Sequence, residues 1–388
     1  MSKKIVLATL SSILLSSGGT HAWLSSSLKS SSIVRGDFSF DYATLPQGCK
    51  AYIARLPKLE AEGLETTAEK VRAIFEYVQK FDPTSKISEE TRQETFRKIE
   101  RCIKTGKKLE MEMLGFSSKS SNTVTKVLGT TFDLADYMGL YTLNHIAKNI
   151  EKAHPPGVIL VIHHIEPFLA DMNKYLEAAI GVPIVDPKAI IEYKATLKRI
   201  VRNFPFLTLA EDLTNVYQGE LHKKESDSKE TLNDRPFDGY AAFFKGELNH
   251  PRITNAIEET QLRRLGKKAS KTQLKKSLDA LAKGLAQVYD HGVNRFRRVL
   301  VQRSGTETLR LSIHGSSQRL GISTIYGHPA APWHNALRVT NSNVALIKKE
   351  DIGKDDAVHD VILCENELTY VEAIPKTSRK FVGLWSGD

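Results

Sequence analysis

The chain has 388 residues, of which 41% are hydrophobic and 26% charged, a globular composition that excludes wholesale disorder and collagen-like repeats. Lysine and arginine number 55 against 45 aspartate and glutamate, and the net charge of +10 favours an anionic partner: nucleic acid, a membrane surface or a small molecule. After residue 23 no apolar run approaches the roughly 18 residues that cross a bilayer, so we expect no transmembrane segment.

The N-terminal segment has the pattern of a secretory signal peptide. Lys3 and Lys4 precede an apolar run, 5–15, and Ala22 supplies the small residue of a cleavage site. We therefore expect a signal peptide over 1–22 and export to the periplasm or the exterior, the alternative being a cytoplasmic protein. Residues 23–50 include a Ser-rich stretch and predict a linker, and residues 51–388 predict one α/β domain.

The N-terminal half is predicted to be mainly helical. Apolar residues at steps of three and four predict helices within 57–82, over 88–107 and from Asp133 onward. The continuous apolar run 158–162 predicts one fully buried strand. Further predicted helices lie at 168–180, at 187–202 with a proline in the first turn, and within 253–290.

After Gly305 the pattern changes to short strands separated by turns. The expected strands are 308–313, 322–325, 337–339, 358–363 and 381–384. Helices with one buried strand, followed by a run of strands, predict an α/β fold. We expect a mixed sheet flanked by helices, a helical N-terminal layer and a strand-rich C-terminal part.

Two features carry no functional assignment. Cys49, Cys102 and Cys364 lie far apart without a CxxC pair, which argues against structural zinc and leaves one disulfide or buried thiols open. The basic run 263–276 suits a solvated helix face. Because no zinc-finger spacing or aromatic RNA-binding signature accompanies it, we expect no nucleic-acid partner.

Directly before the helix at Asp133, the sequence FSSKSSN (116–122) forms a polar segment. Ser118, Lys119 and Asn122, with Lys126 shortly after, bring a positive charge and directed hydrogen bonds to one loop. This combination suits an anionic group, although the segment lacks the glycine pattern of a P-loop. The alternative is an ordinary surface loop.

The predicted strand 308–313 has one polar face. Because side chains alternate along a strand, Arg310, Ser312 and His314 share one side, with leucines and an isoleucine on the other. Arg310 suits a phosphate or carboxylate, and His314 suits proton transfer. The alternative is a half-exposed edge strand.

Two further places hold histidines. In the turn APWHN (331–335), Trp333 offers an aromatic wall and His334 a proton-transfer group, unless the tryptophan only covers the core. His163 and His164 end the buried strand and point to opposite faces, so they cannot easily share a metal. We expect no metal site there.

Six sequence blocks, in their order and spacing, resemble the isocyanide (isonitrile) synthase family, also called the pyoverdine/dityrosine biosynthesis family. They are FSSKSSN (116–122), KVLG (126–129), DLADYMGLYTLNHI (133–146), PPGVILVI (155–162), LRLSIHG (309–315) and APWHNALRV (331–339). The resemblance covers about 110–345. It implies a Rossmann-type α/β fold and the conversion of an aromatic L-amino acid, tyrosine or tryptophan, into an isonitrile. The carbon comes from ribulose 5-phosphate, without metal or organic cofactor.

The resemblance also implies roles for individual residues. The expected partners are the two small-molecule substrates alone. Their binding is assigned to Arg310, Ser312, Ser118, Asn122, Lys126 and Trp333. Catalysis is assigned to His314, His334 and Lys119, with Lys119 also a candidate for anion binding.

Two departures favour a second hypothesis. Family members usually have a Ser-Asp-Gly turn after the buried strand, where this chain has His163, His164 and Ile165. The aspartate that accepts a proton and the glycine that permits close approach are both missing. A signal peptide would also separate the protein from cytoplasmic ribulose 5-phosphate. The alternative is an exported, catalytically degenerate homologue that binds an anionic small molecule or a partner protein.

Overall fold

The fold is described from a computed structural model. The described ranges are 42–82, 87–116, 132–164, 187–210, 266–287, 308–313, 320–328, 335–347, 357–363 and 368–375, with the short pieces 241–242, 245, 258–259, 262, 317 and 331–332.

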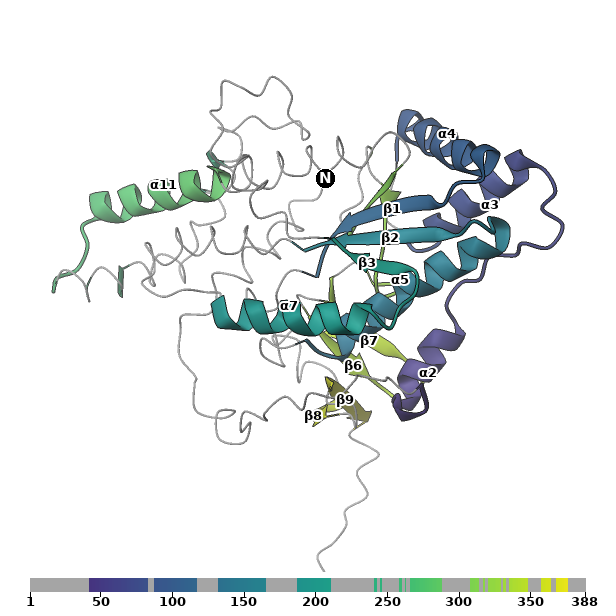
Figure 1. Cartoon of the computed structure of the whole chain (residues 1–388). Helices are drawn as coiled ribbons and strands as arrows, with labels where there is room; N and C mark the ends of the chain where they lie inside the picture. The colour runs from purple at the N-terminus through teal and green to yellow at the C-terminus, as the bar shows by residue number, and fades with distance from the viewer. Residues whose placement is uncertain are drawn as a thin grey trace, which may run out of the picture.

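A five-stranded parallel sheet forms the centre of the fold (Figure 1). Its spatial order is β3-β2-β1-β4-β5. The strands are β1 (Leu109–Leu114), β2 (Val158–His163), β3 (Leu207–Leu209), β4 (Leu309–Ser312) and β5 (Leu320–Gly321). The chain builds outward from β1 to β3 on one side and then adds β4 and β5 on the other, so the strand order reverses between β1 and β4.

Helices cover one face of this sheet. α5 (Leu134–Ala153) connects β1 to β2 and packs against β2, and α3 (Thr67–Gln79) packs against α5 and α4 (Glu89–Thr105). In Figure 1, α3 and α5 lie behind the strands. The strands turn Met111, Met113 and Leu160 into this layer, and each of them is at most 1% exposed. The sheet and helices thus share one apolar core.

Local signals set the helix boundaries. Thr66 with Glu69 and Asp133 with Asp136 form capping boxes that satisfy the free amide groups of α3 and α5. Gly106, in the left-handed conformation with φ 64°, ends α4. α7 (Pro187–Val201) begins at its proline. These beginnings confirm the helices predicted in these regions.

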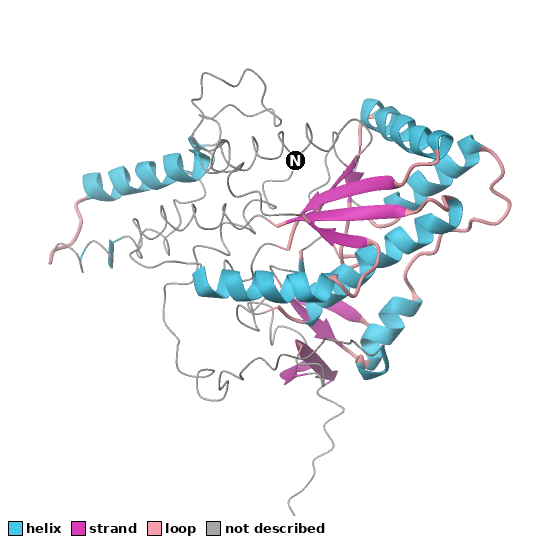
Figure 2. Cartoon of the chain, in the orientation of Figure 1, coloured by secondary structure: helices cyan, strands magenta, loops and turns pink. Residues whose placement is uncertain are grey.

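The C-terminal strands form a second sheet (Figure 2). It is mixed and has the order β7-β6-β9-β8, from β6 (Ala336–Val339), β7 (Val344–Ile347), β8 (Ala357–Leu363) and β9 (Thr369–Pro375). Because α5 contacts β6 and β9 as well as β2, it joins the two sheets. The predicted α/β class, N-terminal helical layer and strand-rich C-terminal part are confirmed. The strand-rich part is divided between two sheets.

Some predicted elements differ from the observed ones. The sequence predicted one strand in the first half, whereas β1 and β3 flank β2. The predicted strand 322–325 is wrong: β5 is Leu320–Gly321, and Ile325 bridges only to His328. Ile322 and Ile325 are buried, 2% and 0% exposed, without belonging to a strand ladder. α11 (Lys271–Gln287) lies within the predicted 253–290. The predictions at 168–180 and 381–384 lie outside the described residues.

Several observations concern the ends and the cysteines. Helix α2 (Gln47–Ala54) begins before the predicted domain start at residue 51. Residues 1–41 lie outside the described part, so the signal peptide and linker remain predictions. Cys49 and Cys102 are buried. None of the helices in the described part combines the length and apolar character that a membrane span requires.

The hydroxyl of Tyr52 links three parts of the fold. It lies 2.8 Å from Thr142 Oγ1 on α5 and accepts a hydrogen bond of 2.7 Å from the amide of Tyr326. Because Tyr52 and Thr142 are both buried, Tyr52→Phe should lower the free energy of unfolding by about 1–3 kcal/mol. Urea unfolding at pH 7 measures this, with the half-exposed Tyr42 as Tyr42→Phe control.

The same variant should change the alkaline stability. Burial raises the pKa of Tyr52 to about 12, above the value of about 10 in an unfolded chain. The contribution of Tyr52 to the free energy of unfolding is therefore complete below about pH 10. It is lost as the pH rises toward 12, because the tyrosine of the unfolded chain ionises first. Tyr52→Phe should make this decline shallower. Equal slopes for variant and wild type would contradict the assignment.

Candidate functional site

One face of the parallel sheet carries a polar row at its centre. Arg310 on β4 pairs in register with Glu112 on β1, so both side chains lie on the same face, about 5 Å apart at Cα. On β4, Leu309 and Leu311 are buried while Arg310 and Ser312 are half-buried. This confirms the predicted alternation. The arginine lies beside the central strand of the sheet.

Glu112 forms a buried pair with His163 at the carboxyl end of β2. The carboxylate Oε2 lies 3.3 Å from His163 Nε2, and the residues are 4% and 8% exposed. Since a carboxylate only accepts, Nε2 is the donor of this contact, and in the neutral imidazole the Nδ1 lone pair is then available. Nδ1 is buried and has no hydrogen-bond partner among the described residues. The pair is arranged to hold an imidazole in one tautomer.

The polar residues lie where the strand order reverses. In open α/β sheets, ligands bind beyond the carboxyl ends of the strands at this switch point, here between β1 and β4. The register places Ser312, Leu114 and His163 at the same level near that edge. Along the chain, the 116–122 segment follows β1, and Ile313 and His314 follow β4. Two of the predicted polar segments therefore start at this edge.

Phe116, the first residue of the 116–122 segment, has an unusual backbone. Its φ is 50°, and it is the only non-glycine residue with a positive φ among the described residues. Its side chain is fully buried. Such conformations cost about 1–3 kcal/mol and concentrate at functional sites. The amide of Gly115 donates to the carbonyl of His163 at 3.2 Å and holds β1 to β2 at this point. The chain is thus turned sharply as it enters the predicted anion-binding loop.

Pro332 approaches the same place as Phe116. A Cβ added to Gly139 on α5 would lie 3.1 Å from Pro332 Cγ and 3.4 Å from Phe116 Cζ. Asn335, which is 3% exposed, donates from Nδ2 to the carbonyl of Ala331 at 2.8 Å and closes the turn. Phe116 and Pro332, far apart in the sequence, therefore meet at one glycine of α5.

A second titratable cluster lies at the N-terminus of α5. Asp133 and Asp136 are fully buried. Burial, and then the carboxylates of Asp136 and Asp133, raise the pKa of Tyr193 on α7 well above its usual value. The Tyr193 ring stacks on His164 with 6.2 Å between centroids. These groups lie next to the carboxyl end of β2, and the phenol stays protonated at neutral pH.

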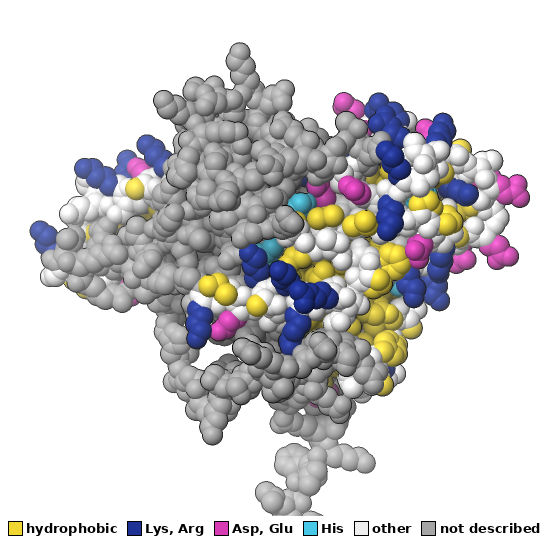
Figure 3. Space-filling model, in the orientation of Figure 1, with side chains coloured by type: hydrophobic (Ala, Val, Ile, Leu, Met, Phe, Trp, Pro, Cys, Tyr) yellow, Lys and Arg dark blue, Asp and Glu magenta, His cyan; other side chains and the backbone are white. Residues whose placement is uncertain are grey.

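The helix beside this cluster is basic. α7 carries Lys188, Lys194, Lys198 and Arg199, and lysine and arginine side chains gather over it in Figure 3. Positive potential of this kind favours the approach of anionic small molecules.

The structure describes two of the predicted site residues, Arg310 and Ser312. The predictions for Ser118, Lys119, Asn122, Lys126, His314, Trp333 and His334 lie outside the described residues and stay predictions. Sequence reasoning missed Glu112, because β1 was not recognised as a strand, and also Tyr193. The alternation of LEMEML (109–114) is the signal that would have revealed Glu112.

Comparisons with known proteins agree with this fold. A family model described as "Pyoverdine/dityrosine biosynthesis protein" matches residues 99–238 and 250–361. The chain is 24% identical to an L-tyrosine isonitrile synthase of Xenorhabdus nematophila over 66% of this chain and 75% of that protein. It is 24% identical to the isocyanide synthase xanB of Aspergillus fumigatus, over 64% of this chain and only 35% of that protein.

A solved structure has the same fold. The PvcA protein from Pseudomonas aeruginosa superposes with a TM-score of 0.55 at 16% identity, and the match covers 78% of this chain and 99% of that one.

Proposed function

Because this chain belongs to the pyoverdine/dityrosine biosynthesis family, we propose that it is an isonitrile synthase-like enzyme. Its substrates would be an aromatic L-amino acid, tyrosine or tryptophan, and ribulose 5-phosphate. The amine attacks the ketone, and water leaves to form an imine. Both carbon–carbon bonds of the ketone carbon are then cleaved, so that the one-carbon part and the three-carbon part with the phosphate leave and the ketone carbon becomes the isonitrile carbon. The observation that carries the proposal is the row of Arg310, Glu112 and His163 at the switch point of the sheet.

Anion binding is the first task of such a site. The Arg310 guanidinium offers two parallel hydrogen bonds to a phosphate or carboxylate. Ser312 lies on the same face, one pleat nearer the carboxyl edge. Lys119 in the predicted loop would add a point charge. Both substrates carry such groups, a phosphate in one and a carboxylate in the other.

Proton transfer is the second task. Imine formation needs a proton taken from the amine and one given to the departing water, which a positioned imidazole supplies. His163 has this chemistry, because Glu112 fixes its tautomer and leaves Nδ1 as a base. His163 is also the first residue of the stretch 163–165, where family members usually have Ser-Asp-Gly. We propose that it takes over proton transfer there, together with the predicted carriers His314 and His334.

A product assay tests the proposal. The purified protein is incubated with ribulose 5-phosphate and, separately, with tyrosine, tryptophan and a panel of other amino acids, and the products are analysed by mass spectrometry. We expect an isonitrile from tyrosine or tryptophan. A formylated amine differs in mass and would show the variant reaction, whereas no product across the panel would contradict the proposal.

The second candidate is a degenerate homologue that binds without turnover. The observation that favours it is the loss of the Ser-Asp-Gly turn at residues 163–165. Calorimetric binding of ribulose 5-phosphate together with an empty product assay would select this candidate. Turnover would remove it.

A further inference from the structure

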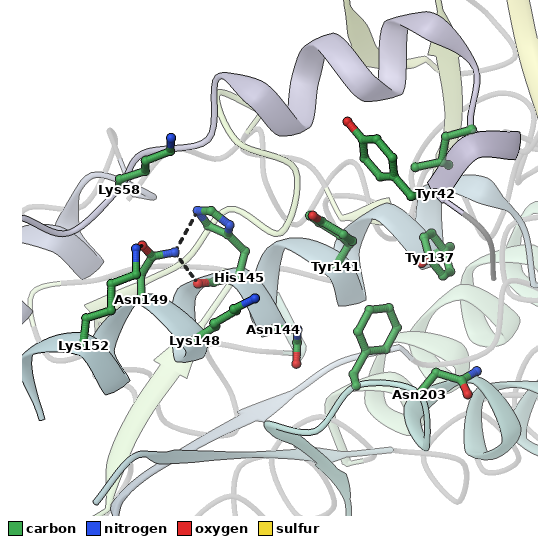
Figure 4. Close-up of a pocket in the computed structure, with 12 residues that line it drawn as sticks. Tyr42, Lys58, Tyr137, Tyr141, Asn144, His145, Lys148, Asn149, Lys152 and Asn203 are labelled. Carbon is green, nitrogen blue, oxygen red and sulfur yellow. Dashed lines mark hydrogen bonds between the residues drawn. The ribbon is translucent and has the colours of Figure 1, made fainter. Parts of the chain in front are cut away.

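A pocket of about 460 Å³ runs along α5, on the side of the helix away from the sheet (Figure 4). Its walls come from α5, from the segments before and after α2, and from the turn between α7 and β3. The lining residues are Tyr42, Leu45, Lys58, Tyr137, Tyr141, Asn144, His145, Lys148, Asn149, Lys152, Asn203 and Phe204. This volume lies in the range that holds small organic ligands.

One end of the pocket is strongly basic. Lys148 and Lys152 come from the last turns of α5, and Lys58 lies across from them on the segment between α2 and α3 (Figure 4). No lining residue is acidic. Burial lowers the pKa of His145 most, and the charges of Lys152, Lys58 and Lys148 lower it further. All three lysines therefore act on this histidine. An anion placed there would meet three positive charges.

Hydrogen bonds hold the groups at this end in place. Lys152 Nζ donates to Asn149 Oδ1 at 3.0 Å, and Asn149 Nδ2 donates to the backbone carbonyl of His145 at 2.9 Å. His145 Nε2 lies 2.9 Å from the carbonyl of Pro57, next to Lys58. Asn149 is only 3% exposed, so the hydrogen bond to Lys152 comes from a buried side chain. Lys152 is therefore held in place before any ligand binds.

The other end of the pocket is aromatic. Tyr137 and Tyr141 lie one and two turns from the start of α5, and Tyr42 and Phe204 complete the wall. Tyr42 is 49% exposed at the pocket, whereas Tyr137 is 5% exposed. Aromatic side chains such as these bind a flat ring by stacking or edge contact.

The pocket is separate from the candidate site at the carboxyl edge. α5 begins beside that edge and runs back to the amino end of β2, because it connects two parallel strands. Lys148 and Lys152 lie at the end of the helix that precedes Val158, on the opposite edge from Arg310 and His163. A ligand there does not compete with the proposed reaction for these side chains.

We propose that this pocket binds a phosphorylated small molecule that carries a flat ring, the chemistry that a nucleotide has. The phosphates lie between Lys58, Lys148 and Lys152, and the ring lies against Tyr42 and Tyr141. The proposal does not depend on the proposed function, because it concerns binding alone.

Isothermal titration calorimetry with three probes tests the two halves of the pocket: ADP, inorganic pyrophosphate and adenosine. We expect ADP to bind most tightly, pyrophosphate less tightly and adenosine weakest. Lys148→Gln/Lys152→Gln should weaken ADP and pyrophosphate about tenfold or more, since two charges are lost. Tyr42→Ala should weaken ADP several-fold, about the value of one aromatic contact, and leave pyrophosphate unchanged.

Two controls separate this site from others. Lys275→Gln/Lys276→Gln removes the same charge from the exposed surface of α11 and should leave all three affinities unchanged. Arg310→Leu should also leave ADP binding unchanged, which separates the pocket from the candidate site. The proposal is overturned if the wild type binds none of the probes at millimolar concentration, if the pocket variant binds as the wild type does, or if the α11 variant loses affinity equally.

Discussion

Arg310→Leu should abolish measurable binding of ribulose 5-phosphate while the protein stays folded. The guanidinium lies on the polar face of β4, at the switch point of the sheet, where it can meet an anion with two charge-assisted hydrogen bonds. Loss of two such bonds corresponds to a decrease in affinity of roughly 100-fold or more. Leu309 and Leu311, which pack into the core on the other face, are untouched. Calorimetry with ribulose 5-phosphate measures the loss.

Two further variants make this result interpretable. Arg310→Lys keeps the positive charge beside Glu112 but loses the planar fork, and it should bind with intermediate affinity. Arg97→Leu removes an exposed arginine from α4 and should bind as the wild type does. Urea unfolding of each variant identifies a folding defect. Wild-type affinity in folded Arg310→Leu would contradict the anion-binding role.

His163→Gln should lower turnover by about 10²- to 10⁴-fold and leave substrate binding within a few-fold of the wild type. Glutamine is close in size and can still donate to Glu112, but an amide does not titrate near neutral pH. Glu112→Gln should have a smaller effect in the same direction, because the imidazole keeps its place and loses the carboxylate that sets its tautomer. Single-turnover kinetics at saturating substrate separates chemistry from binding.

The predicted carriers His314 and His334 provide the comparison. When each of these histidines is replaced by glutamine in turn, the loss of turnover in the same assay measures its contribution to proton transfer. His328→Gln alters a half-buried histidine that belongs to none of the segments at the switch point, and it should leave turnover unchanged. Turnover retained in His163→Gln and lost in His314→Gln would contradict the role of His163 and leave the family assignment intact.

The parts of the fold that were predictable have local signals. α5 starts at Asp133 because a capping box is encoded within four residues, and α7 starts at a proline. β2 was predictable because of its continuous apolar run, although Ile159 and Val161 on one of its faces are half-buried rather than buried. The polar face of β4 followed from strict alternation, which needs no partner strand to be known.

The central strand β1 has a weaker local signal, because its composition opposes its alternation. Its sequence LEMEML contains two glutamates and no β-branched residue, so its intrinsic preference is helical. It becomes a strand because β2 and β4 pair with it on both sides. The Glu112–His163 pair and the meeting of Phe116 with Pro332 at Gly139 depend on this non-local arrangement. Propensity and spacing along the chain do not contain that information.

We propose that the ketone carbon of ribulose 5-phosphate becomes the isonitrile carbon of the product. The most direct measurement uses ribulose 5-phosphate labelled with ¹³C at the ketone carbon, and in parallel at a neighbouring carbon, with tyrosine or tryptophan as the amine. We expect the isonitrile to carry the label from the ketone position alone, detected by mass and by ¹³C NMR. An isonitrile without that label, or no isonitrile from either amino acid, would contradict the account.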